Sequence, residues 1–472
     1  MPADLDQVHD ELQACAEHVQ RRHSIPAVVW GVVLDGRLAV SGGAGVVAGA
    51  PVTSDTAFRI ASMTKSFTAA AILVLRDEGI VPSLDEPVPG ITPPTADAAP
   101  VTLRLLLSMG AGFVTDDPWA DRHLDIDPAD FDDMIAAGVS FAASPATTFE
   151  YSNLGYGVIG RTIARCTGEL PQTVIERRVL RPLGLGRTAW AAPADGDWAR
   201  PFHLQDGIVR PDGPLLADGA LATMGGLWST VADLARWIAW LDDAFPARDD
   251  RDDGPLRRSS RREMQTVHRA TPLAITAASG DGPDHVPARI DGGGYGFGLQ
   301  IIHDDRFGVI AGHSGGLPGY GSNMRWLPGR RVGVVALANT RYAPMRLLTQ
   351  RMLELLDDRG VVPPRVAPVT PALRDAAHRL VALLNDWDDG AATDLFADNV
   401  ALDESFARRA DAARAVVTEH GQLRVVDVVA GTATEATVAV IAADGSAASV
   451  EVLLAPLATP LVQRYRLQPG AA

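Results

Sequence analysis

Lys65 is the only lysine of the chain, and all the other residues among its 42 lysines and arginines are arginine. An ammonium can lose its proton at a workable pH, whereas a guanidinium cannot, so Lys65 is the basic side chain suited to act as a general base. It stands three residues after a serine, in Ser62-Met63-Thr64-Lys65. This spacing predicts a nucleophilic serine activated by lysine, and the alternative is a chance survivor in an arginine-rich composition.

The position of this pair at the start of a predicted helix favours the catalytic interpretation. Residues i and i+3 share a helix face, so the Lys65 amine lies within reach of the Ser62 hydroxyl. A helix N-terminus disfavours a nearby cation and favours a developing anion, which biases Lys65 towards its neutral form. The backbone N–H of Ser62 is then a natural donor to an oxyanion.

A second candidate segment is Tyr151-Ser152-Asn153. In extended backbone, residues i and i+2 point the same way, so Tyr151 and Asn153 are expected to face the nucleophile while Ser152 turns aside. A phenol beside a lysine can relay a proton, and an amide can hold a substrate carbonyl. The alternative is a polar turn before a helix, with Asn153 as its cap.

The third segment is His313-Ser314-Gly315-Gly316, at the end of an apolar strand. Gly315 and Gly316 would let a substrate lie against the strand edge, and the N–H of Gly316 would complete an oxyanion hole. The alternative is a glycine-rich exit from a strand with a structural histidine. Only the combination of the three segments outweighs these alternatives.

Together the three motifs, in this order and with these separations, resemble the class C β-lactamase superfamily. Relatives in that superfamily include D-alanyl-D-alanine carboxypeptidases, D-aminopeptidases, family VIII carboxylesterases and acyltransferases. The resemblance covers about residues 5 to 358. It extends to three supporting segments, which are Phe58-Arg59-Ile60-Ala61, Gly155-Tyr156-Gly157 and Met224-Gly225-Gly226-Leu227. One departure is His313, because the β-lactamases carry lysine there, and this weighs against β-lactam hydrolysis as the native activity.

The resemblance implies a role for each motif residue. Ser62 would be the acylated nucleophile, and Lys65 and Tyr151 would share the handling of its proton, with the choice of acylation base left open. Asn153 and His313 would position the substrate, together with Gly315 and Gly316. No metal and no cofactor are expected, because no His/Cys/Asp cluster has ligand spacing.

The elements around these motifs predict an α+β fold. Strand signals at 28–40 and at 297–338, with helices between them, favour one antiparallel sheet assembled from both chain ends. An amphipathic helix is expected at 5–21, and a helix at 344–356 closes the unit. The stretch 83–228 reads as a helical insertion, and 245–294 as an exposed excursion with one helical piece at 261–268.

Domain boundaries follow from composition. Residues 1–360 are expected to form the β-lactamase-like serine hydrolase domain, and the proline-rich 361–372 a linker. Residues 373–472 read as a small separate α+β domain, with an NTF2-like fold as the candidate. Helices are expected there at 373–384 and 410–420, and strands at 423–429, 437–441 and 450–454.

Charge and cysteine content exclude several classes of partner. A net charge of −16 argues against nucleic acid and against an anionic membrane surface, since both need clustered cations. Cys15 and Cys166 provide no disulfide framework. The acidic segment 1–20 lacks the apolar core of a secretory signal, and no apolar run is long enough to span a bilayer, so a cytoplasmic location is expected.

The sequence therefore predicts a serine hydrolase that cleaves small esters or amides through an acyl-enzyme, with carboxylesterase activity as the first expectation. D-amino-acid amidase, peptidase or β-lactamase activity, acyl transfer, and a non-catalytic binding module are the alternatives. A small-molecule substrate is the expected partner, and the oligomeric state stays open, a homo-oligomer included. The segment Phe113–His123, with Trp119, is expected either to line the acyl pocket or to be a surface loop with one buried tryptophan.

Overall fold

The computed structural model of the protein describes residues 5–469 except 247, 249, 281–287, 365, 366 and 368. The chain forms two compact units, Met1–Pro363 and Pro364–Ala472. All three motifs belong to the first of these, the N-terminal unit. Within the described residues, no helix is both long and apolar enough to cross a membrane.

A ten-stranded sheet forms the centre of the N-terminal unit within the described residues, and its strands come from both ends of that unit. Their order is β3-β2-β1-β14-β13-β12-β11-β10-β8, with β9 paired to β10, and neighbouring strands are antiparallel. The strands are β1 (Ala27–Leu34), β2 (Arg37–Val47), β3 (Ala50–Pro51), β8 (Arg269–Ala270), β9 (Ala274–Thr276), β10 (Arg289–Tyr295), β11 (Gln300–Asp304), β12 (Gly308–Leu317), β13 (Tyr320–Leu327) and β14 (Val332–Ala338). The pairing of β1 with β14 confirms the expected sheet built from both chain ends.

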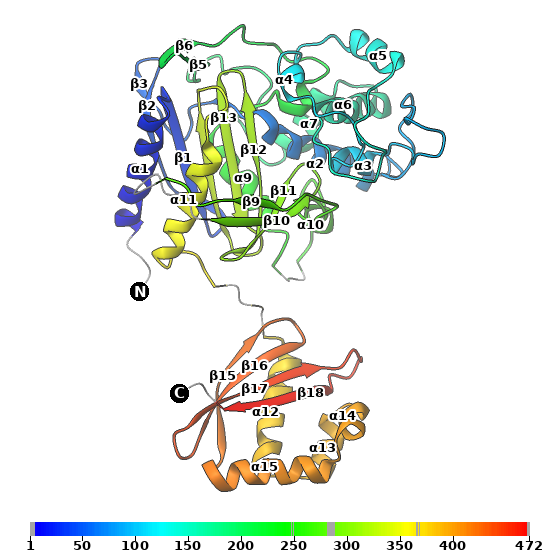
Figure 1. Cartoon of the computed structure of the whole chain (residues 1–472), viewed down its shortest axis with the longest axis vertical. Coiled ribbons are helices and arrows are strands. Elements are labelled where there is room, and N and C mark those ends of the chain that lie inside the picture. Colours follow the sequence, from blue (N-terminus) through cyan, green and yellow to red (C-terminus); the bar gives the residue numbers. More distant parts are fainter. Residues whose placement is uncertain are drawn as a thin grey trace. The chain divides into compact units, whose positions relative to one another are not determined.

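Helices cover both faces of this sheet (Figure 1). Successive side chains of a strand point to opposite faces, so Val29 and Val33 of β1 join one core while Trp30 joins the other. Helices α1 (Leu5–Arg22) and α11 (Met345–Asp358) pack on the Trp30 face. Helix α2 (Thr64–Asp77) and α9 (Val231–Asp242) belong to the opposite core. Helix α2 is buried from Thr64 to Leu75 and is thereby held at the centre of the unit.

Loops make up most of the expected insertion at 83–228, and its regular structure is mainly helical (Figure 1). Its helices are α3 (Leu103–Leu107), α4 (Asp117–Ala120), α5 (Pro128–Ala137), α6 (Asn153–Thr167), α7 (Pro171–Ile175), a π-helical turn η2 (Glu176–Leu180) and α8 (Ala222–Gly225). Thr102 caps α3, and Thr230 caps α9, each by accepting a backbone N–H. A small hairpin of β5 (Phe202–Gln205) and β6 (Ile208–Pro211) was not expected, because neither strand alternates clearly.

The excursion expected at 245–294 contains more regular structure than its composition indicates. Its helix α10 spans Arg258–Met264, earlier than predicted, and β8, β9 and β10 lie in the second half. Strand β10 includes Gly292-Gly293-Gly294, a run that reads as a loop in sequence. A Cβ on Gly294 would stand 2.2 Å from the carbonyl oxygen of Arg269, so glycine is needed for β8 to approach. Residues 247, 249 and 281–287 of this excursion lie outside the described residues.

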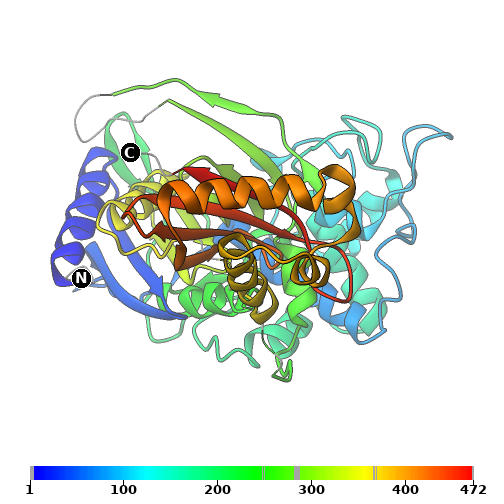
Figure 2. The same cartoon turned by 90° about the horizontal axis from the view of Figure 1, so that it is seen from below.

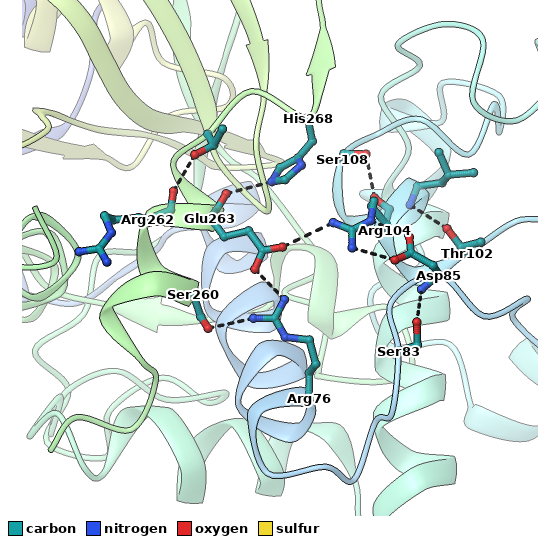
Figure 3. Close-up of polar contacts among 12 residues, drawn as sticks. Arg76, Ser83, Asp85, Thr102, Arg104, Ser108, Ser260, Arg262, Glu263 and His268 are labelled. Carbon is teal, nitrogen blue, oxygen red and sulfur yellow. Dashed lines mark hydrogen bonds and ion pairs between the residues drawn. The ribbon is translucent and has the colours of Figure 1, made fainter. Parts of the chain in front are cut away.

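A cluster of polar side chains joins α10 to the helical region (Figure 3). The Glu263 carboxylate of α10 accepts from Arg76 at 2.6 Å and from Arg104 at 3.5 Å. Arg104 also binds Asp85 through two nitrogen–oxygen contacts of 2.6 and 2.8 Å. Because these groups come from α10, α2, α3 and the loop before α3, they tie α10 to the helical region.

The C-terminal unit is an α+β structure with its own core. Its antiparallel sheet has the order β15-β16-β17-β18. The elements are α12 (Pro371–Asn385), α13 (Asp389–Leu395), α14 (Asp398–Asp403), α15 (Phe406–His420), β15 (Leu423–Ala430), β16 (Glu435–Ala442), β17 (Ala447–Leu454) and β18 (Val462–Pro469). Helix α12 packs on the sheet and α15 packs on α12 (Figure 2). The prediction omitted α13, α14 and β18. Residues 365, 366 and 368 of the expected linker lie outside the described residues.

Candidate active site

Ser62 lies in a short 3₁₀ turn, η1 (Ala61–Met63), that runs directly into α2. Strand β4 (Phe58–Arg59) precedes it and pairs with β7 (Trp228–Ser229). Ala61 has a φ of +50°, an uncommon left-handed value for a residue with a side chain, and it turns the chain sharply before Ser62. The serine was expected in the first α-helical turn. It stands instead just ahead of α2, half-buried at the wall of a cavity.

The Lys65 side chain is completely buried and reaches back along the helix to Ser62. Its Nζ lies 3.0 Å from Ser62 Oγ, 2.6 Å from Asn153 Oδ1 and 2.8 Å from the carbonyl oxygen of Met224. The Nζ also lies 5.0 Å from the centre of the Tyr151 ring. All three hydrogen-bond acceptors are formally neutral, so the amine is fixed in place without a direct ion pair.

Tyr151 and Asn153 approach Lys65 from the start of α6, while Ser152 points away. Ser152 caps α6 by accepting the N–H of Gly155, so Asn153 is not the cap considered as an alternative. Asn153 uses Oδ1 for Lys65 and donates from Nδ2 to Asp117 at 2.7 Å. Its amide group therefore links the buried amine to a carboxylate of the cavity wall.

His313 on β12 is 2% exposed and belongs to a hydrogen-bonded network behind the cavity. Its Nε2 lies 2.7 Å from the hydroxyl of Tyr295, and Nδ1 lies 2.5 Å from the carbonyl oxygen of Ser314. Burial, together with the Lys65 charge, lowers the pKa of His313 to about 3. The imidazole is therefore neutral at physiological pH and adds no charge to the cavity.

Gly315 and Gly316 pass close to the nucleophile turn and to the opposite cavity wall. A Cβ on Gly315 would lie 2.3 Å from the carbonyl oxygen of Ile60, just before η1. A Cβ on Gly316 would lie 2.3 Å from the ring of Tyr342. The pairing of β12 with β11 reaches only to Gly312, so the segment beyond it lines the cavity. The neighbouring atoms of Ile60 and Tyr342 therefore leave no room for a Cβ at either glycine.

Burial shifts the pKa values of the two candidate bases, Lys65 and Tyr151, in opposite directions. Burial lowers the pKa of Lys65 from 10.5 to about 8, although the nearby carboxylates Asp117, Asp121 and Asp116 oppose that shift. Burial raises the pKa of Tyr151 well above its usual value, although its hydrogen bond with Ser62 opposes that rise. The phenol is therefore protonated at neutral pH, whereas a fraction of Lys65 is a free amine.

A cavity of about 490 Å³ opens beside these residues. It brings together Ser62, Tyr151, His313, Gly315 and Gly316, while Lys65 and Asn153 lie buried behind its wall. Its other lining residues are Asp117, Asp121, Phe149, Gln300, Ser314, Ser322, Tyr342, Ala343, Pro344, Met345 and Arg346. Ser314 belongs to the third motif, but sequence reasoning did not single out the other lining residues from Phe149 onwards, Tyr295 behind them, or the Met224 carbonyl. No spacing signal links such distant segments.

The segment Phe113–His123 does line the cavity, but through its aspartates rather than its tryptophan. Trp119 is 40% exposed and stacks on His123 at 4.5 Å between ring centres, so the alternative of a surface loop with one buried tryptophan was wrong. Asp117 and Asp121 face the cavity. Asp116 instead accepts the N–H groups of Asn153 and Leu154 at 2.8 and 2.7 Å and so anchors the start of α6.

Among the residues that the structure describes, no group of three or more His, Cys, Asp or Glu side chains has a metal-binding arrangement. The two cysteines are both free thiols.

Comparison with known proteins agrees with the geometry. The family described as Beta-lactamase matches residues 12–357. D-alanyl-D-alanine-carboxypeptidase/endopeptidase AmpH of Escherichia coli K12 is 25% identical over 328 residues, covering 67% of this chain and 80% of AmpH. Esterase EstB of Burkholderia gladioli is 28% identical over 379 residues, covering 70% of this chain and 84% of EstB. The octameric penicillin-binding protein homologue from Pyrococcus abyssi aligns in structure with a TM-score of 0.63 and 22% identity, covering 97% of this chain and 99% of that one.

Proposed function

The chain belongs to the Beta-lactamase family and is a serine hydrolase of that family, and we propose that it cleaves small ester or amide bonds through an acyl-enzyme on Ser62. The observation that carries the proposal is the 3.0 Å contact between Lys65 Nζ and Ser62 Oγ at the wall of an open cavity. A serine hydroxyl needs an adjacent base to attack a carbonyl carbon, and this geometry supplies one.

Lys65 is the acylation base in this proposal. The lowered pKa of Lys65 makes its neutral form accessible, and the raised pKa of Tyr151 keeps the phenol protonated. Neutral Lys65 takes the Ser62 proton as Oγ bonds to the carbonyl carbon. Tyr151 then passes its proton to the leaving oxygen or nitrogen as the scissile bond breaks, and it regains a proton from Lys65, so both groups return to their starting forms. In deacylation, water attacks the acyl carbonyl carbon while neutral Lys65 takes a proton from it, and that proton returns to Ser62 Oγ as the acid leaves.

The oxyanion that forms in each step needs backbone donors. The proposed donors are the N–H groups of Ser62, at the sharp turn before α2, and of Gly316 on β12. Asn153 and His313 position the substrate, and Gly315 keeps β12 close to the nucleophile turn. The glycine contacts with Ile60 and Tyr342 support this close packing.

Among the reactions open to such a site, we place carboxylesterase-like cleavage first. The neutral His313 gives the β12 edge no cation for a substrate carboxylate, which supports uncharged esters over β-lactams. The name of the EstB relative is in keeping with this choice, and that of AmpH keeps D-peptide cleavage as the second candidate. Acyl transfer to an added alcohol or amine would use the same acyl-enzyme.

The first test compares the wild type with Ser62→Ala on a short-chain p-nitrophenyl ester and on a chromogenic cephalosporin. Ester turnover that disappears in Ser62→Ala, with little cephalosporin turnover, is the expected result. A serine-directed phosphonate should add one adduct mass to the wild type and none to Ser62→Ala. Absence of both turnover and labelling in the wild type would favour a non-catalytic binding module.

We propose that the residues from 373 form an NTF2-like accessory module. We also propose that the whole protein is cytoplasmic and forms a homo-oligomer. The independent core of the C-terminal unit supports the first of these. Two unbridged thiols suit a reducing compartment. The octameric state named for the Pyrococcus abyssi homologue motivates the third, and light scattering on the purified protein tests it.

A further inference from the structure

We infer that Tyr295 is a positioning residue of the active site and acts through His313. Its hydroxyl donates to His313 Nε2, leaves the imidazole hydrogen on Nδ1, and so directs Nδ1–H to the carbonyl oxygen of Ser314. This relay holds the part of β12 that carries Gly316. The inference rests on the proposed function, because it concerns the geometry of the same Ser62 site.

The hydrogen atoms of the relay follow from what each group can donate. The carbonyl oxygen of Ser314 can only accept, so the His313 Nδ1 that lies 2.5 Å from it carries a hydrogen. Burial and the Lys65 charge lower the pKa of His313 to about 3, so the imidazole is neutral and has a single N–H. Nε2 is therefore an acceptor, and the Tyr295 hydroxyl 2.7 Å away is its donor.

Both ring nitrogens of His313 are then used within the protein. Nδ1 binds the Ser314 carbonyl oxygen and Nε2 binds Tyr295, so neither nitrogen remains to bind a substrate directly. The side chain is 2% exposed although it borders the cavity, which suits an indirect role. His313 therefore positions a substrate through the backbone that its ring holds.

Tyr295 lies behind the residues that line the cavity and is itself held firmly. It ends β10, is 1% exposed, and packs edge-on against Tyr151 and His313, with ring centres 6.3 and 5.7 Å away. Burial raises the pKa of Tyr295 well above its usual value, so the hydroxyl keeps its hydrogen. The neighbouring phenol, Tyr156, gives its own hydrogen to the Leu107 carbonyl oxygen at 2.9 Å. Tyr295 thus supplies the hydrogen that Nε2 accepts.

The segment held by this relay has lost one of its neighbouring strands. The pairing of β12 with β11 ends one residue before His313, and side chains take over from there. Asn323 of β13 donates to Ser314 Oγ at 2.8 Å, and Tyr295 of β10 holds the imidazole. Without the Tyr295 hydroxyl, the ring would be free to turn and the Ser314 carbonyl to move. The N–H of Gly316, proposed as an oxyanion donor, would move with them.

The test compares Tyr295→Phe with Tyr320→Phe in p-nitrophenyl ester hydrolysis. Tyr320 is a matched control, because it is fully buried and its hydroxyl donates to the Ala199 carbonyl oxygen at 2.9 Å rather than to His313. Tyr295→Phe should lower kcat by about tenfold with little change in KM, since a misplaced oxyanion donor weakens transition-state binding more than substrate binding. Tyr320→Phe should lose a similar amount of stability in urea titration and keep its kcat.

A second measurement observes the relay directly and does not depend on turnover. The ¹⁵N spectrum of labelled histidine side chains shows which ring nitrogen carries the hydrogen, and the signals of His313 are those absent from His313→Gln. The wild type should show an Nδ1–H imidazole between pH 5.5 and 8, and Tyr295→Phe should shift the Nε2 signal. An Nε2–H or doubly protonated imidazole in the wild type would overturn the inference, even where Tyr295→Phe does not fold.

This inference and the proposed function fail in different ways. Ser62-dependent ester turnover with the same kcat in the wild type and in Tyr295→Phe would overturn the inference and leave the proposed function standing. Absence of Ser62-dependent turnover in the wild type would overturn the proposed function, and the ¹⁵N spectrum would still decide whether Tyr295 sets the tautomer of His313.

Discussion

The rate of acylation should follow the protonation of Lys65. The pKa of about 8 leaves about one enzyme in ten with a neutral amine at pH 7, against about one in three thousand at the unperturbed 10.5. Burial of this side chain thus increases the reactive fraction by about 300-fold at pH 7. Below pH 8, kcat/KM should rise by about tenfold per pH unit, and it should level off above.

The perturbation that tests this assignment is Lys65→Arg. A guanidinium does not become neutral in proteins, so the inflection near pH 8 should vanish and kcat/KM should fall by about 10²- to 10⁴-fold. The assay is p-nitrophenyl ester hydrolysis between pH 5 and 9.5, with circular dichroism to establish that the variant is folded. Ser62→Ala measures the background rate.

A second group that titrates in the cavity must be distinguished from Lys65. Burial raises the pKa of the Asp121 carboxyl to about 6, so this group becomes negatively charged as the pH rises through that value. Asp121→Asn should remove any inflection near pH 6, and it should move the Lys65 inflection to a lower pH, because the Asp121 charge raises the pKa of Lys65. A level profile from pH 6 to 9 in the wild type, or an inflection near pH 8 that persists in Lys65→Arg, would refute the assignment of Lys65 as the base.

Three further substitutions test how the site is supported. Gly315→Ala places a Cβ 2.3 Å from the Ile60 carbonyl oxygen, so it should lower the unfolding free energy by about 1–3 kcal/mol and lower kcat/KM. Gly186→Ala, whose Cβ would have no atom within 4 Å, should change neither quantity, and equal urea midpoints for the two variants would contradict this reasoning. Asp116→Ala leaves two N–H groups at the start of α6 without their acceptor, so about 1–3 kcal/mol of stability and part of kcat/KM should be lost in urea titration and ester kinetics. Glu263→Gln weakens a part-exposed carboxylate bridge between Arg76 and Arg104 (Figure 3) and should lower the stability by about 1 kcal/mol, hence Tm by a few degrees, with no change in KM. The decrease in Tm should be smaller in 1 M salt, and a decrease that does not depend on salt would contradict an ionic contribution.

Local pattern was sufficient for much of the fold. The continuous apolar runs of β1 and β14, the Asp35-Gly36 turn between β1 and β2, and the cap at Thr102 each depend on neighbouring residues in the chain. Strand β10 was missed because its three glycines have no intrinsic strand preference. The close approach of β8 requires Gly294, and the positive φ of Gly293 together with the nearby Ile301 carbonyl oxygen of β11 requires that glycine.

By itself, the sequence determined the identity and order of the residues that carry the family's motifs, because a unique lysine and short fixed spacings are local properties. It also determined that Ser62 and Lys65 would be neighbours, since i and i+3 meet on any helical turn. Tertiary structure alone decided the charge state of the site and the character of its cavity. Burial sets the pKa of Lys65 and His313, and folding brings Asp117 and Asp121 beside a nucleophile more than 50 residues away. Desolvation and long-range electrostatics depend on which surfaces are removed from water, and no linear spacing encodes that.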